Sequence, residues 1–167
     1  MQGEELRAAV EKNRDLVFRI AYTYLRDAAD ADDVTQDVFV KLLRREGSFE
    51  SGEHLRNWLV RVCVNECRSL FRRPWRRVED IEAYANSLRM PSEGHAELLT
   101  SVMRLPEKYR VPLVLHYYVG LSTGEVAELL RLPGATARTR LARARGRLRE
   151  MLAEDVAQGA KEAHDAC

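Results

Sequence analysis

Seven arginines lie between positions 131 and 149, and no acidic residue stands among them. A guanidinium group neutralises a phosphate, and it can also donate a pair of hydrogen bonds to the edge of a guanine. The segment therefore predicts binding to nucleic acid. Arg138 and Thr139 are the candidates for contacts with bases, because they stand near the start of the expected helix. The candidates for contacts with the phosphate backbone are Thr136, Arg140 and Arg143.

The residues around these arginines predict the helices that position them. Ser122 or Thr123 can cap a helix of about two turns, Pro133-Gly134 breaks the chain, and a final helix is expected from about Ala135 to Leu152. A short capped helix, a tight break and a longer basic helix form the helix-turn-helix plan, in which the second helix enters a DNA major groove. A solvated basic helix that binds RNA or an acidic partner explains the arginines, but not the cap and the break. The residues of the short helix that should face the core are Val126, Ala127 and Leu130.

The N-terminal half separates its charges in a similar way. Five aspartates and no basic residue lie between positions 27 and 37, and Asp27 or Asp30 can cap a helix that starts there. After a loop at 47–52, a third helix from position 54 or 55 to about 73 opens a stretch with seven arginines and one acid, Glu66. The apolar residues of the acidic helix are Val38, Phe39, Val40, Leu42 and Leu43. The expected apolar stripe of the third helix is Trp58, Leu59, Val62, Leu70 and Phe71.

Apolar residues recur at helical spacing along most of the chain, and no strand-like alternation persists. The sequence therefore predicts an all-α fold of two small helical domains joined by a linker. The expected limits are 1–74 for the first domain, 75–95 for the linker and 96–153 for the second domain. Residues 154–167 are expected to form a polar tail, which is disordered by default.

Several classes of function find no support in the sequence. No apolar run reaches the roughly 18 residues of a membrane span, and no signal peptide is evident, so we expect a cytoplasmic protein without membrane insertion. Cys63 and Cys67 could share a metal at their spacing, but two thiols do not complete a zinc site, and small buried side chains are the expected alternative. No glycine-rich phosphate loop, nucleophile elbow or metalloprotease helix is present. We therefore expect no enzymatic activity, no cofactor, no bound metal and no small-molecule substrate.

The motifs of the two halves together resemble the extracytoplasmic-function sigma factors, which are bacterial subunits that direct RNA polymerase to promoters. The stretches that resemble region 4 of this family are Leu105-Pro-Glu-Lys-Tyr-Arg110 and Thr136-Ala-Arg-Thr-Arg-Leu-Ala-Arg-Ala-Arg145. The stretches that resemble region 2 are Asp30-Ala-Asp-Asp-Val-Thr-Gln-Asp-Val-Phe39, Trp58-Leu-Val-Arg-Val-Cys-Val-Asn65 and Arg72-Arg73. They stand in the order of the family and span roughly residues 8–75 and 96–150.

The resemblance implies a role for each charged segment. The acidic helix would bind core RNA polymerase, and the helix-turn-helix would bind the duplex −35 element of a promoter. The third helix and the loop before it would bind the melted −10 element, and an anti-sigma protein would be a further partner. The candidates for polymerase binding are Asp32, Asp33, Gln36, Asp37 and Phe39. The candidates for −10 binding are Arg61, Asn65, Arg68, Arg72 and Phe49, the last of which has the alternative role of anchoring its loop.

Four positions depart from the family pattern. Glu66 and Ser69 stand where an apolar residue and an aspartate are expected, so two positions of the −10 region differ from the family. Ala135 and Ala137 replace a glycine and a valine in the final helix, and neither change removes a DNA-facing group.

Two other functions account for part of the same pattern. A stand-alone helix-turn-helix regulator would bind its operator as a dimer without polymerase, and its N-terminal half would sense a ligand or a partner. This function leaves the acidic helix and the stretch Trp58–Asn65 without an explanation. A sigma-like interaction protein would sequester a partner, but the retained Arg138 and Arg140 count against that role.

Overall fold

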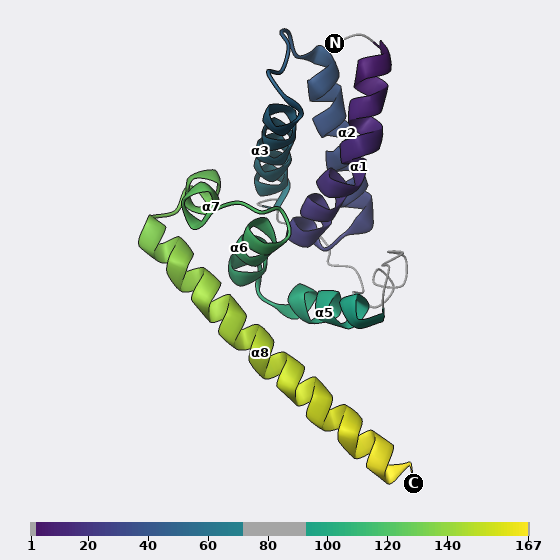
Figure 1. Cartoon of the computed structure of the whole chain (residues 1–167), viewed down its shortest axis with the longest axis vertical. Coiled ribbons are helices and arrows are strands. Elements are labelled where there is room, and N and C mark those ends of the chain that lie inside the picture. The colour runs from purple at the N-terminus through teal and green to yellow at the C-terminus, as the bar shows by residue number, and fades with distance from the viewer. Residues whose placement is uncertain (1–2, 72–92, 167) are drawn as a thin grey trace. The chain divides into compact units, whose positions relative to one another are not determined.

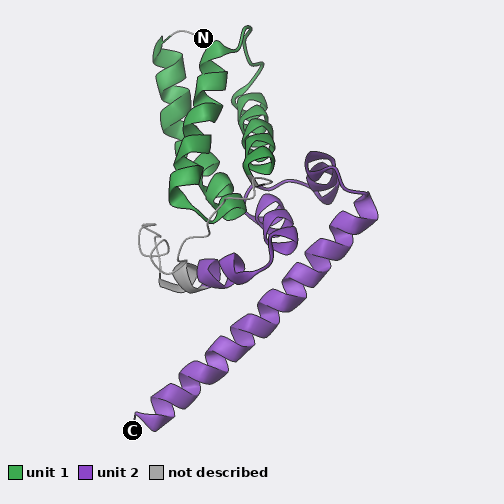
Figure 2. Ribbon diagram, turned by 180° about the vertical axis from the view of Figure 1, so that it is seen from behind, with its two compact units in different colours: residues 1–79 green, residues 80–167 purple. Residues whose placement is uncertain are grey.

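The computed structural model describes residues 3–71 and 93–166, and every regular element in these ranges is a helix. The chain divides into two compact units, residues 1–79 and residues 80–167 (Figure 2). The predicted all-α fold with two helical domains is therefore confirmed. The predicted linker at 75–95 lies outside the described residues except at its end, where the first helix of the second unit begins at Glu93.

Three helices form the first unit, and each contacts the other two (Figure 1). They are α1 (Gly3–Leu25), α2 (Ala28–Arg44) and α3 (Gly52–Phe71). The side chain of Asp27 accepts a hydrogen bond from the backbone N–H of Asp30 at 2.8 Å, so Asp27 is the cap of α2. Residues at the centre of the core include Val17, Ile20, Leu25, Val34, Val38, Leu42, Leu59 and Val64.

The buried face of α3 differs in part from the predicted stripe. Leu59 is buried as expected, but Trp58, Val62 and Leu70 are only half-buried, and the side chain of Phe71 lies outside the described part. The other buried residues of this face are Val60, Cys63, Val64 and Cys67. Both thiols are free, and Sγ of Cys63 lies 3.4 Å from the carbonyl oxygen of Val17 in α1. The cysteines thus serve as small core residues that let α1 approach α3 closely.

Glu66 departs from the family pattern at a position near α2. Its carboxylate forms an ion pair with Nζ of Lys41 in that helix. The side chain of Glu66 is 27% exposed and that of Lys41 is 50% exposed, so the pair adds little to stability. Its effect is electrostatic: the acid is neutralised within the unit, beside the exposed face of α3 that carries Arg61 and Asn65.

The second unit is organised around its last helix. Its elements are α5 (Glu93–Arg104), α6 (Glu107–Tyr117), α7 (Thr123–Leu130) and α8 (Gly134–Asp165). The long α8 contacts each of the other three helices (Figure 1). A buried cluster joins α5, α6 and α8, and its members are Val102, Leu105, Tyr109, Leu113 and Ala144. Leu148 and Met151 extend this cluster along α8 and are partly buried.

A tight turn joins α7 to α8. The hydroxyl of Ser122 accepts a hydrogen bond from the N–H of Glu125, and the carboxylate of Glu125 accepts one from the N–H of Ser122, which completes a capping box. The helix ends at Arg131 in the left-handed conformation, with φ at 55°, and the N–H of Leu132 donates to the carbonyl of Ala127 at 2.8 Å. The predicted cap and break are confirmed. Buried as predicted are Val126, Ala127 and Leu130.

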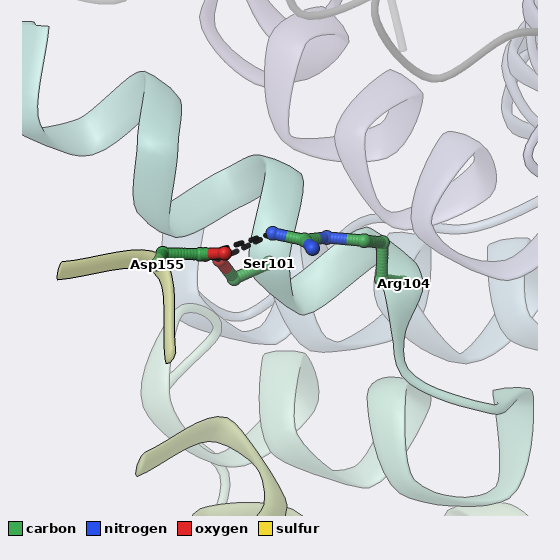
Figure 3. Close-up of polar contacts among 3 residues, drawn as sticks. All are labelled: Ser101, Arg104 and Asp155. Carbon is green, nitrogen blue, oxygen red and sulfur yellow. Dashed lines mark hydrogen bonds and ion pairs between the residues drawn. The ribbon is translucent and has the colours of Figure 1, made fainter. Parts of the chain in front are cut away.

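The final helix is longer than predicted, because α8 continues past Leu152 to Asp165. The expectation of a disordered tail from residue 154 was therefore wrong for the described residues. A cluster of side chains joins the first turn of this extension to α5 (Figure 3). The carboxylate of Asp155 accepts hydrogen bonds from the guanidinium of Arg104 at 2.9 Å and from the hydroxyl of Ser101 at 3.3 Å. These three residues form the α5–α8 latch.

Replacing Asp155 with alanine should destabilise the packing of α5 on α8 by less than about 1 kcal/mol. The charged side chains of Arg104 and Asp155 are 45% and 46% exposed, so solvent screens their attraction. Amide hydrogen exchange in α5 measures the local opening, and we expect faster exchange there in the variant. Glu154→Ala, an exposed neighbour, is the matched control; equal acceleration in both variants would contradict the latch.

The capping box makes the start of α7 sensitive to pH. The backbone N–H and the side chain of Ser122 lower the pKa of Glu125 from 4.5. Because the folded pKa lies below the unfolded one, the stabilisation by the carboxylate is present above pH 4.5 and is lost as the pH falls through the folded pKa.

Ser122→Ala should therefore destabilise α7 by about 1 kcal/mol at neutral pH. It should also raise the pKa of Glu125 only part of the way to 4.5, because alanine keeps the backbone N–H at position 122, which lowers that pKa more than the hydroxyl does. The difference in stability between variant and parent should shrink at lower pH. Hydrogen exchange in α7 and an NMR titration of the Glu125 carboxyl measure the two effects. Thr123→Ala serves as the control, and equal hydrogen exchange in Ser122→Ala and in the parent protein would contradict the capping role of the hydroxyl.

Candidate nucleic-acid interface

The first turns of α8 carry the predicted DNA-binding residues. Arg138, Thr139 and Arg143 are exposed, whereas Thr136 and Arg140 are half-buried at the edges of the helix. The opposite side of the same turns is buried in the core through Ala137, Leu141 and Ala144. One face of α8 therefore holds the helix in the unit and the other is open to solvent, as the recognition helix of a helix-turn-helix requires.

Two of the exposed candidates contact the first turn of α8 itself. The hydroxyl of Thr139 donates a hydrogen bond to the carbonyl of Ala135 at 2.9 Å. Nη1 of Arg138 lies 3.5 Å from the point that a Cβ on Gly134 would occupy. A Cβ at Gly134 would meet this guanidinium at an ordinary van der Waals distance, which places the guanidinium over the start of the helix. The side chains of Arg138 and Thr139 lie near the N-terminus of α8. In helix-turn-helix proteins, this end of the recognition helix contacts the bases.

Arg143 and Arg147 flank a buried tyrosine of α6. The guanidinium of Arg147 lies 4.7 Å from the centroid of the Tyr109 ring, and Nζ of Lys108 lies 5.0 Å from it. Burial raises the pKa of Tyr109, but a hydrogen bond from Arg143 and the charges of Lys108 and Arg147 outweigh it, so the pKa is lowered from 10.0. Arg143 is thereby held at the side of α8, which suits a phosphate contact better than a base contact.

A contact that the sequence did not predict orients one more arginine. Tyr117 in α6 is 58% exposed, and its hydroxyl accepts a hydrogen bond from Nη1 of Arg145 at 2.9 Å. His116 is half-buried, and its Nδ1 donates to the carbonyl of Leu121 at 2.6 Å, across the loop before α7. No local spacing connects Tyr117 with Arg145, so sequence periodicity could not reveal the pair.

The candidates for −10 binding lie at one side of α3 and in the loop before it. Arg61 and Asn65 are one turn apart and exposed, and Arg68 follows them, half-buried. Ser69, which departs from the family pattern, is exposed one turn beyond Asn65. Arg72 lies outside the described residues.

Phe49 lies in the loop between α2 and α3 and contacts three side chains. Its ring centroid lies 5.3 Å from that of His54 and 5.7 Å from that of Trp58, both in edge-on arrangements. The guanidinium of Arg45 covers it at 4.1 Å from the ring centroid. A base could stack on the covered face only after Arg45 moved. The geometry therefore favours the alternative role, in which Phe49 anchors the loop on α3.

The predicted polymerase-binding residues of α2 fall into two groups. The exposed residues are Asp33, Gln36 and Asp37. Asp32 is half-buried and pairs with Nη2 of Arg14 in α1 at 3.6 Å, and it also accepts a hydrogen bond from Gln36 at 3.4 Å. Phe39 is half-buried. The helix thus exposes Asp33, Gln36 and Asp37 to solvent, whereas Asp32 interacts with Arg14 and Gln36.

Two aliphatic side chains continue this exposed face, although the sequence pattern placed them with the apolar residues of α2. Val40 is 40% exposed and Leu43 is 63% exposed. Their helical spacing from Gln36 and Asp37 could have shown that they share the acidic side. An acidic face that ends in exposed aliphatic residues suits a protein partner better than nucleic acid, whose phosphates it would repel.

Two further kinds of site are not found in the described ranges. Among residues 3–71 and 93–166, no group of three or more His, Cys, Asp and Glu side chains is arranged to hold a metal ion. None of the helices in these ranges has the length and apolar character of a membrane span.

Both units match known sequence families. Residues 9–77 match Sigma-70 region 2, and residues 95–148 match Sigma-70, region 4. The ECF RNA polymerase sigma factor SigW of Bacillus subtilis (strain 168) is 27% identical over 161 residues, which cover 86% of each chain. The ECF RNA polymerase sigma factor SigM of Mycobacterium tuberculosis (strain ATCC 25618 / H37Rv) is 33% identical over 138 residues, which cover 80% of this chain and 70% of SigM.

Solved structures share the fold. The sigma factor RpoE from Bartonella quintana, in complex with the anti-sigma factor NepR, has a TM-score of 0.66 at 21% identity, over 89% of this chain and 97% of RpoE. CnrH, in complex with the cytosolic domain of CnrY, has a TM-score of 0.60 at 24% identity, over 92% and 91% of the two chains. The two matched regions stand in the same order as the two helical units and together cover most of the sequence. The chain therefore belongs to the sigma-70 family, among the extracytoplasmic-function sigma factors.

Proposed function

We propose that this sigma factor binds core RNA polymerase through the exposed face of α2, the melted −10 element through α3 and the duplex −35 element through α8. Its family acts in promoter-specific transcription initiation, and the residue assignments are inferred here from exposure and charge. The observation that carries the proposal is a difference in chemistry: the exposed face of α2 is acidic and partly aliphatic, whereas the exposed face of α8 is basic. The two faces suit partners of opposite chemistry.

The face of α2 is the proposed polymerase contact. Asp33, Gln36 and Asp37 supply charge and hydrogen bonds, and the exposed Val40 and Leu43 supply apolar area. Interfaces between proteins combine these two features, with an apolar centre and a polar rim. Asp32 takes a supporting role in the proposal, because Arg14 already neutralises part of its charge.

The −10 contacts are assigned to α3. Asn65 can pair with a base edge, and Arg61, Arg68 and Arg72 can hold the backbone of the single strand. Phe49 contributes by fixing the loop, through its contact with Trp58. The pairing of Glu66 with Lys41 supports this assignment, because it neutralises an acidic side chain next to the residues that we propose to bind the single DNA strand.

Tethering explains how modest contacts give selective initiation. Once α2 is bound to the polymerase, α3 and α8 are tethered to the same enzyme. The first DNA contact then raises the effective concentration for the second, so the overall affinity for the promoter exceeds that of either contact alone. The free chain should bind promoter DNA weakly by comparison. An anti-sigma protein is proposed as a further partner, since RpoE was solved in complex with the anti-sigma factor NepR. A cytoplasmic location and the lack of catalytic activity belong to the same proposal.

Transcription with purified core polymerase tests the proposal directly. Protein-dependent transcripts should start at particular promoters only when core and this protein are both present. Tight operator binding without core, together with no core-dependent initiation, would instead identify a stand-alone helix-turn-helix regulator.

Asp33→Lys should weaken binding to core polymerase at least about tenfold, which corresponds to about 1.4 kcal/mol. The change places a like charge against a surface that accepts an acid, while the exposed position leaves the fold intact. Affinity is measured with labelled protein and core enzyme. Asp15→Lys makes the same charge change on the exposed side of α1 and should leave affinity unchanged. Normal affinity of Asp33→Lys for core polymerase would contradict the assignment of this face of α2 to the interface.

Leu43→Ser tests the apolar part of the same face. Loss of an exposed aliphatic side chain should not destabilise the unit, so a weaker affinity for core would come from the interface. Unaltered affinity in this variant would confine the contact to the acidic residues.

Arg138→Ala should change −35 selectivity by about 1–3 kcal/mol at one base position if Arg138 reads a base. Arg143→Ala should instead weaken binding equally on all sequences and reduce its salt dependence, because its guanidinium lies at the side of α8 with Tyr109. Promoter-library transcription at two salt concentrations measures both effects. Uniform weakening by Arg138→Ala would make that residue a phosphate contact.

A further inference from the structure

Arginines in the middle of α8 stand on two opposite flanks of the helix. Arg143 and Arg147 are one turn apart on the same flank, and both are exposed. At 3.6 residues per turn, Arg145 lies roughly 160° around the helix from each of them, and it is half-buried. The buried residues Leu141 and Ala144 face the core between the two flanks. The solvent side of α8 is therefore bordered by cations along both edges.

Contacts with α6 place the two flanks independently of helical spacing. This helix packs against α8 (Figure 1), and its residues Tyr109 and Tyr117 are about two turns, or about 12 Å, apart. The guanidinium of Arg147 lies 4.7 Å from the ring centroid of Tyr109. Nη1 of Arg145 lies 2.9 Å from the hydroxyl of Tyr117. Because a helix with its side chains is about 10–12 Å across, α6 spans α8 and brings one tyrosine to each flank.

The contact between Tyr117 and Arg145 orients a cation without neutralising it. The hydroxyl of Tyr117 accepts the hydrogen bond, and a tyrosine hydroxyl is uncharged at neutral pH. A guanidinium has several N–H donors, so one bond to a hydroxyl does not exhaust its capacity. Tyr117 is 58% exposed, which places this pair at the edge of the unit rather than in its core. The pair is thus suited to meet an anion from solvent.

The major groove of DNA has a phosphate wall on each side. It is about 12 Å wide, so a helix that enters it brings each of its flanks near the backbone of one strand. We propose that Arg145, positioned by Tyr117, contacts the phosphate backbone of one DNA strand. Arg143 and Arg147 contact the backbone of the other strand, with Tyr109 beside them. This inference rests on the proposed function, in which α8 binds the −35 element.

The test measures the affinity of the full-length protein with core polymerase for a promoter fragment on which the two together start transcription. In two further fragments, the phosphates of the −35 element are replaced by uncharged methylphosphonates on one strand or on the other. The parent protein, Arg143→Ala and Arg145→Ala are compared on all three fragments. Circular dichroism checks that the variants are folded, and a salt series gives the dependence of affinity on ionic strength.

Arg145→Ala should weaken binding to the unmodified promoter about tenfold or more, because a charge-assisted hydrogen bond is lost. It should cause little further loss on one of the two modified fragments and its full loss on the other. Arg143→Ala should show the reverse pattern. Suppression of both losses by modification of the same strand would overturn the division between strands. A full loss from Arg145→Ala on both modified fragments would show that Arg145 contacts no phosphate.

Tyr117→Phe tests the positioning role, because it removes the hydroxyl and keeps the ring and the charge of Arg145. It should weaken binding about two- to tenfold as Arg145 regains side-chain freedom, and only where Arg145→Ala also has its full effect. The slope of log affinity against log salt should become shallower by about 0.9 in Arg145→Ala and stay at the parent value in Tyr117→Phe. Tyr118→Phe removes the neighbouring hydroxyl and should match the parent. Parental affinity of Tyr117→Phe, or an equal loss on both modified fragments, would exclude the positioning role.

The first step of this experiment separates the inference from the proposed function. If no promoter gives transcripts that depend on both core polymerase and this protein, the proposed function fails, and the strand contacts fail with it. If transcription starts and Arg145→Ala and Tyr117→Phe bind as the parent does, only the roles of these two residues fail.

Discussion

The close crossing of α7 on α8 is the contact on which the DNA-reading face depends. Ala127 and Ala137 are buried where these helices meet, and larger side chains at either position would push them apart. The turn between them uses Arg131 in the left-handed conformation, which costs on the order of 1 kcal/mol for a residue other than glycine. The hydrogen bond from Leu132 to Ala127 and the burial of Leu130 offset that cost. Because the turn and the crossing are fixed together, Arg138 and Thr139 are presented at a set angle to the unit.

The arrangement of charge explains how a nearly neutral chain can bind DNA. The net charge is +1, but acidic side chains dominate the exposed face of α2, and arginines dominate the first turns of α8. Within the first unit, the pairs Arg14–Asp32 and Lys41–Glu66 neutralise charges on α2 and α3. Attraction between exposed charges decays over about 8 Å at physiological salt, so each face acts on its own partner with little influence from the total.

Sequence reasoning succeeded where the determinants are local. The caps at Asp27 and Ser122 and the buried side of α7 follow from residues within one or two turns, and each was predicted. It failed where distant residues decide the outcome. The contact between α5 and the part of α8 beyond Leu152 joins Asp155 to Arg104, which is 51 residues away. The stripe of α3 was partly wrong for a different reason: Trp58 was weighted as a core residue, whereas the small cysteines are more deeply buried. The −10 and polymerase contacts depend on partners outside the chain, so they stay predictions.

The tyrosines of α6 contact arginines of the helix that we propose to bind DNA. Arg143 and Arg147 are positioned by Tyr109, and Arg145 is positioned by Tyr117. An arginine that is already held in place gives up less side-chain freedom when it meets a phosphate, so more of its interaction remains as affinity. These three arginines lie C-terminal to Arg138 and Thr139 on the same helix. A fixed set of cations beside Arg138 and Thr139 therefore suits the phosphate contacts that we propose for α8.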